Sequence, residues 1–98
     1  MPTTMYPKEP IVGSRTIWGQ ADYVDVWIPG RVVFVGTPSH GGFWVHEEIW
    51  NELAPDLRAF AFKWGHGEPG WFEEDSTAWK LLEARPDLMA LHEERQGI

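Results

Sequence analysis

The chain has 98 residues, a net charge of −7 and seven tryptophans, and it contains no cysteine. This length predicts a single domain, and the lack of cysteine excludes disulfides, thiolate metal sites and thiol catalysis. No apolar run approaches the ~18 residues of a membrane-spanning helix, and the N-terminus lacks the basic and apolar regions of a signal peptide. We therefore expect a cytoplasmic protein without a membrane partner.

The first half of the chain predicts a small antiparallel sheet. Residues 1–13 are rich in proline and glycine and are expected to form a flexible arm, followed by a single domain over residues 14–98. Strands are indicated at residues 15–18, 23–28, 31–36 and 43–45. The run 31–36 is apolar and β-branched, which favours a central strand buried on both faces. Gly41 and Gly42 predict a turn before the last of these strands.

The second half predicts helices. Apolar residues recur at helical spacing over residues 46–54, and Pro55 is expected to end this helix. Residues 59–64 fit a helix or a strand, and we favour a strand because their aromatic residues alternate. A loop at 65–70, a helix from about residue 75 and a further turn or short helix starting at Pro86 complete the pattern. The expected fold is therefore α+β, with a small antiparallel sheet of three to four strands packed by two to three helices.

All of the net charge lies in the second half of the chain. Residues 1–46 hold three acidic and three basic residues, whereas residues 47–98 hold twelve acidic and five basic ones. Direct binding to nucleic acid is not expected, since phosphates need a basic surface. An acidic half suits a basic protein partner, and the alternative is that it serves only to keep the protein soluble.

The first motif is Thr-Pro-Ser-His-Gly-Gly at residues 37–42. His40 could act as a general base and Ser39 as a nucleophile. The favoured interpretation is a tight turn in which His40 caps a carbonyl or meets a carboxylate. The segment is neither a Gly-x-Ser-x-Gly nucleophile elbow nor a phosphate-binding loop.

The second motif is Gly-Trp-Phe-Glu-Glu-Asp at residues 70–75, in which three consecutive carboxylates repel one another unless something compensates them. A helix start explains one or two of them, with Asp75 or Ser76 as the N-cap. A carboxylate facing His40 could serve acid–base or metal chemistry. We favour a structural lock between the turn and the helix, with no metal and no cofactor. The residues assigned to this lock are His40, Gly41, Gly42 and Trp71.

The two motifs, in this order, are similar to a domain of unknown function that recurs in phages, prophages and other bacterial mobile elements. Its pattern is a strand ending in a Thr-Pro-x-His-Gly-Gly turn, with an aromatic-Glu-Glu-Asp box opening a later helix. The resemblance covers roughly residues 31–80 and implies a mobile-element origin. Small acidic proteins of such elements commonly act by binding, as anti-CRISPR proteins do.

The resemblance and the charge together lead to the expected function, an inhibitor of a host nucleic-acid-binding defence complex, with a CRISPR effector as the candidate partner. The expected partner contacts are Glu73, Glu74, Asp75, Glu83, Asp87, Glu93 and Glu94, with exposed tryptophans as anchors. The alternative is a hydrolase or metal-binding enzyme that uses His40 with the box at 73–75. A homodimer is a third hypothesis, because seven tryptophans could supply an apolar interface.

Overall fold

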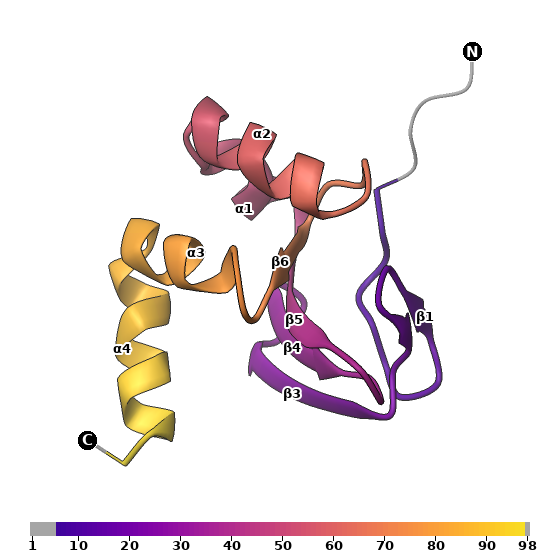
Figure 1. The fold of residues 1–98 in the computed structure, drawn as a ribbon. Coiled ribbons are helices and arrows are strands. Elements are labelled where there is room, and N and C mark those ends of the chain that lie inside the picture. Colours follow the sequence, from indigo (N-terminus) through magenta and orange to yellow (C-terminus); the bar gives the residue numbers. More distant parts are fainter. Residues whose placement is uncertain (1–5, 98) are drawn as a thin grey trace.

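The computed structural model describes residues 6–97 and contains two sheets and four helices (Figure 1). The strands are β1 (Arg15–Thr16), β2 (Gly19–Gln20), β3 (Tyr23–Ile28), β4 (Val32–Gly36), β5 (Gly41–Val45) and β6 (Trp71–Glu73). The helices are α1 (Glu47–Glu52), α2 (Pro55–Trp64), α3 (Ala78–Ala84) and α4 (Pro86–Arg95). Strands β1 and β2 form a hairpin, and the other four form an antiparallel sheet in the order β3-β4-β5-β6. The predicted α+β class and antiparallel sheet are confirmed.

The four-stranded sheet is packed on both faces, and each face has its own core. The core on the helical side includes Val32, Phe43, Val45, Phe72, Ile49, Trp50, Leu81 and Leu88. The core under the N-terminal segment and the hairpin consists of Val33, Val35, Trp44 and Trp71, with Tyr6, Ile17 and Trp18 packed against it. Figure 1 shows the helices and the hairpin on opposite sides of the sheet. The predicted burial of the 31–36 strand on both faces is confirmed.

The N-terminal segment lies along the second face of the sheet. The Tyr6 hydroxyl donates to the Val45 carbonyl at 2.6 Å, and Trp44 Nε1 donates to the Pro7 carbonyl at 3.0 Å. Burial, and secondarily the charge of Glu47, raises the pKa of the Tyr6 hydroxyl well above its ordinary value. Of the arm expected at residues 1–13, residues 1–5 lie outside the described part of the chain. Within residues 6–97, no helix is both long enough and apolar enough to cross a membrane.

The strand expected at residues 59–64 is wrong, because this segment belongs to helix α2. Pro55 does not merely end the preceding helix; it occupies the first turn of α2, where a proline loses no hydrogen bond. Ala61 is buried against the core, whereas Phe62 and Trp64 are exposed. The alternating aromatics therefore arise from a helix that places aromatic residues on its solvent side as well.

The strand expected at residues 15–18 is shorter than predicted and ends at Thr16. The Thr16 hydroxyl donates to the Gly19 carbonyl at 2.8 Å and accepts from the Trp18 backbone N–H at 3.0 Å. These bonds turn the chain back into β2, so that Trp18 packs on the sheet.

The turn expected at Gly41 and Gly42 is also wrong, since both glycines lie in β5 and are buried. The turn comes before them, where the Thr37 N–H donates to the His40 carbonyl at 2.8 Å. A Cβ on Gly41 would lie 2.7 Å from the Val35 carbonyl oxygen. A Cβ on Gly42 would lie 2.6 Å from the Trp18 ring and would also overlap the Phe72 carbonyl. The two glycines are therefore needed for close packing of β5, not for a bend.

We expect Gly42→Ala to lower the free energy of unfolding by about 1–3 kcal/mol or more. The added methyl group would overlap backbone atoms of the neighbouring strand, and these atoms cannot move aside. Gly36→Ala in β4 is the matched control, since its Cβ would find its nearest neighbours at 3.6 Å, an ordinary contact. Urea unfolding of both variants measures the difference. Equal stability of the two variants would contradict the close packing described for β5.

Candidate functional site

The acidic box forms the end of β6 and the turn that leads into α3. Glu73 Oε1 accepts from the Asp75 N–H at 3.1 Å and from the Ser76 hydroxyl at 2.9 Å, and the Glu73 N–H donates to Thr77 Oγ1 at 2.7 Å. Helix α3 begins at Ala78, and Thr77 holds the N-cap position. The predicted helix start near residue 75, with Asp75 or Ser76 as its cap, is therefore wrong. The Asp75 N–H and the Ser76 hydroxyl both donate to Glu73 instead.

His40 lies beside the first carboxylate of the box. Its Nδ1 is 3.6 Å from Glu73 Oε2, and the side chains are 55% and 17% exposed respectively. This distance is longer than a hydrogen bond, so the contact is an ion pair only when His40 is protonated. The backbone joins the same two segments more firmly, since the Glu74 N–H donates to the Gly41 carbonyl at 2.9 Å.

The other residues assigned to the lock act within the sheet. Gly42 pairs with Glu73, and Trp71 is buried in the second core, where its ring meets Trp18 edge to face at 5.4 Å. A hollow of about 430 Å³ opens beside His40 and Glu73, and Asp75 also lines it. Among residues 6–97, no group of three or more histidine, aspartate and glutamate side chains is placed to hold a metal ion.

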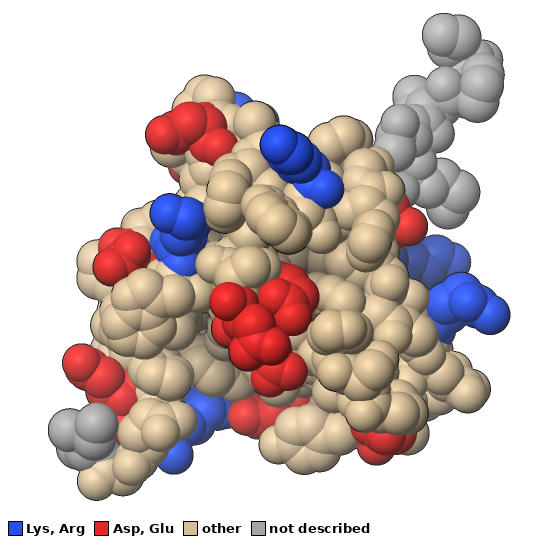
Figure 2. Space-filling view, viewed as in Figure 1, with Lys and Arg blue, Asp and Glu red and all other residues tan. Residues whose placement is uncertain are grey.

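The seven carboxylates predicted to contact a partner fall into two groups. Three already have partners within the chain: Glu73 in its turn, Glu83 as acceptor from Trp79 Nε1 at 3.1 Å, and Asp87 in a two-bond contact with Arg85. The remaining four, Glu74, Asp75, Glu93 and Glu94, are exposed, and their carboxylates make no ion pair or hydrogen bond within residues 6–97. Figure 2 shows acidic atoms gathered over the turn between β6 and α3, with lysine and arginine side chains around them.

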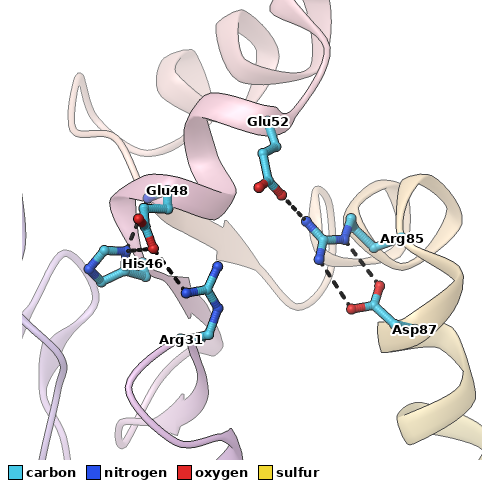
Figure 3. Close-up of polar contacts among 6 residues, drawn as sticks. All are labelled: Arg31, His46, Glu48, Glu52, Arg85 and Asp87. Carbon is cyan, nitrogen blue, oxygen red and sulfur yellow. Dashed lines mark hydrogen bonds and ion pairs between the residues drawn. The ribbon is translucent and has the colours of Figure 1, made fainter.

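Two ion-pair clusters join the helices to their surroundings (Figure 3). Arg85 contacts Asp87 at 3.1 Å and Glu52 at 3.0 Å, and its hydrogen bonds hold the pKa of Asp87 below its ordinary value. At the start of α1, Glu48 contacts Arg31 at 2.9 Å, and the Glu48 N–H donates to the His46 ring at 3.0 Å. Both clusters are structural and leave these carboxylates less available to a partner.

A groove of about 380 Å³ that the sequence did not predict lies on the helical face of the sheet. Its floor is formed by Phe34 and Phe43, whose rings meet edge to face at 5.2 Å. Strand β3 supplies one wall and helix α3 the other, and the last turns of α4 contribute to its lining. Glu74 of the acidic box also lines this groove, whereas its neighbour Asp75 lines the hollow beside His40.

A bulge in β3 and one ion pair shape the β3 side of this groove. The register shifts between Val26 and Ile28, so that Trp27 and Ile28 both pack against the helical-side core instead of alternating. Arg95 donates two hydrogen bonds to Asp25, at 2.8 and 3.2 Å, and its guanidinium lies 4.7 Å from the centre of the Trp27 ring. The hydrogen bond from Arg95 is the main reason that the pKa of Asp25 is held below its ordinary value.

Sequence reasoning missed the groove because its parts come from distant segments. Asp25 and Arg95 are 70 residues apart, and neither residue belongs to a recognisable motif. One local signal was available: Trp79 and Glu83 are four residues apart on a predicted helix, a spacing at which side chains meet.

We expect Glu73→Ala to lower the free energy of unfolding by about 1–2 kcal/mol, because it leaves the Asp75 N–H and the Ser76 hydroxyl without their acceptor. His40→Ala should cost less than about 0.5 kcal/mol, since an exposed ring at this distance contributes little. Glu74→Ala is the control for loss of a neighbouring charge. Thermal unfolding of the three variants ranks them, and a larger loss for His40→Ala would show that the histidine carries the lock.

Asp25→Asn should lower the free energy of unfolding by about 1 kcal/mol at neutral pH, because it weakens the two-bond contact with Arg95. Since the folded pKa of Asp25 is depressed, this stabilisation is full above about pH 4 and is lost as the pH falls through the depressed value. Wild type and variant should therefore converge in strong acid, as urea unfolding at both pH values can measure. Asp22→Asn, at an exposed position, is the control, and a gap that persists in strong acid would contradict this account.

Comparison with known proteins assigns the chain to a family. No curated protein and no solved structure matches it. Residues 11–97 match the model of a family described as Domain of unknown function (DUF7007), and the match spans the hairpin, the sheet and all four helices. The chain therefore belongs to the DUF7007 family, a domain of unknown function.

Proposed function

We propose that this domain is a binding protein whose acidic second half recognises a basic surface on a partner protein. The observation that carries this proposal is the surroundings of Trp79, which is 52% exposed. Its indole N–H donates to Glu83, and Glu74 lines the same groove. An exposed tryptophan with carboxylates around it is suited to anchor a cationic side chain, since the ring face and the carboxylates attract positive charge together.

The electrostatics favour the four carboxylates without a partner in the described residues over the other three predicted contacts. Glu74, Asp75, Glu93 and Glu94 make no ion pair within the described residues, so a partner's lysine or arginine would gain a new interaction with them. Such charges also accelerate association with a basic surface at low ionic strength. Asp87 contributes less, because Arg85 already neutralises it.

The finer proposal concerns the identity of the partner. The resemblance of the two motifs to proteins of phages and mobile elements favours a host defence complex in the bacterial cytoplasm, with a CRISPR effector as the leading candidate. The basic grooves of such complexes bind phosphates, and exposed carboxylates can occupy them in place of nucleic acid. Inhibition would follow from exclusion of the nucleic acid.

A hydrolytic role for His40 with Glu73 is less well supported. Their separation of 3.6 Å exceeds a hydrogen bond, and the other oxygen of Glu73 already accepts from Asp75 and Ser76. A carboxylate used in this way is better suited to holding its turn than to orienting a catalytic base.

The test is binding to purified CRISPR effectors, together with inhibition of their cleavage of target DNA. We expect binding to weaken at least tenfold between about 0.05 M and about 0.5 M salt, because exposed charges are screened. Glu74→Gln combined with Asp75→Asn should weaken binding about tenfold and relieve inhibition. The matched control is Glu9→Gln combined with Asp22→Asn, which changes the net charge equally at exposed positions in the first half. Binding that does not depend on the salt concentration, or equal losses of affinity for the two double variants, would contradict the proposal.

A further inference from the structure

The groove next to Trp79 already holds one guanidinium group. Arg95 stacks on Trp27 at 4.7 Å and donates two hydrogen bonds to Asp25. Arginine is the side chain best suited to such a site, because its flat guanidinium can stack on an aromatic ring while it binds a carboxylate through two N–H groups. The chain itself therefore shows which chemistry this groove accepts.

The rest of the groove offers the same two components, a tryptophan ring and a carboxylate. Helix α3 presents the ring of Trp79, which meets the His92 ring of α4 edge to face at 5.8 Å and still has an exposed fraction of 52%. Glu74 lines the groove as well, and its carboxylate makes no ion pair or hydrogen bond within the described residues. An aromatic ring and an unpaired carboxylate thus share one concave surface of about 380 Å³.

We propose that this part of the groove is a binding site for an arginine side chain of a protein partner, with Trp79 as the stacking surface and Glu74 as the carboxylate. The inference rests on the proposed function, since it names the residue by which a basic partner is recognised. It also goes beyond net charge, because it requires a guanidinium, and a lysine ammonium would form a poorer match to a ring and a carboxylate. Repulsion from Arg95 is reduced, because Asp25 neutralises that charge.

The probe is acetylated hexa-arginine amide carrying a fluorophore, compared with hexa-lysine and with the uncharged hexa-citrulline, and binding is followed by anisotropy. We expect hexa-arginine to bind at least about threefold more tightly than hexa-lysine, and hexa-citrulline not to bind. Trp79→Leu should weaken hexa-arginine about fivefold and abolish its advantage over hexa-lysine, whereas Trp79→Phe should restore part of it.

Two matched controls separate the groove from general attraction. Trp64→Leu removes a tryptophan of similar exposure, 53%, on α2, which lines the hollow beside His40 and not this groove, and it should leave the preference for arginine over lysine unchanged. Asp75→Asn should weaken hexa-arginine less than Glu74→Gln, because only Glu74 lines the groove. Circular dichroism of each variant checks that the fold is retained.

The outcomes distinguish the two proposals. One outcome is that both charged peptides bind equally, lose affinity alike in Glu74→Gln and Asp75→Asn, and bind Trp79→Leu as tightly as wild type. This outcome contradicts the arginine site in the groove, whereas the proposed recognition of a basic partner by the acidic second half still stands. If neither charged peptide binds even at low salt, the proposed recognition of a basic partner is contradicted as well. An arginine preference that disappears in Trp79→Leu and persists in Trp64→Leu supports the groove.

Discussion

Strand β5 is the element on which the rest of this structure depends, because it pairs with a strand on each side and is buried on both faces. Phe43 and Val45 enter the core beneath the helices, whereas Trp44 enters the core beneath the N-terminal segment. A shift of one residue along β5 would exchange these two sets of side chains, so its register is strongly determined. The pairing of Gly41 with Gly36 of β4 and of Gly42 with Glu73 of β6 follows from that register.

The three consecutive acidic residues after this pairing differ in what they contact. Glu73 lies beside His40 and uses its carboxylate to hold the turn into α3. Glu74 lines the aromatic groove, and Asp75 lines the hollow next to His40. The repulsion within the box is reduced because Glu74 lines a different hollow from Glu73 and Asp75, and because the Asp75 N–H and the Ser76 hydroxyl donate to Glu73. Only two of the three carboxylates therefore remain without a partner among the described residues.

The predictions from sequence succeeded where one physical pattern dominated a segment. The β-branched run in β4 and the apolar spacing of α1 and α4 were recognised because a single burial pattern extends over several residues. The predictions failed where one residue type can serve two different structural roles. Glycine in β5 serves close packing and not a turn, and the aromatics of α2 follow a helix whose outer side is also aromatic. The helix expected from about residue 75 begins only at Ala78, because residues 71–73 join the edge of the sheet through long-range pairing and the following turn is held by Glu73.

The α+β class, the central strands and the excess of acid in the second half can be read from the amino-acid sequence, since these depend on local periodicity and composition. Which acids lack a partner within the described residues, and where an aromatic groove opens, depend on how distant segments pack together. A bulge in the edge strand β3 brings Ile28 to the same side as Trp27, and Arg95 reaches Asp25 across 70 residues of chain. Neither arrangement leaves a local pattern in the sequence, because both depend on contacts between segments that are distant along the chain.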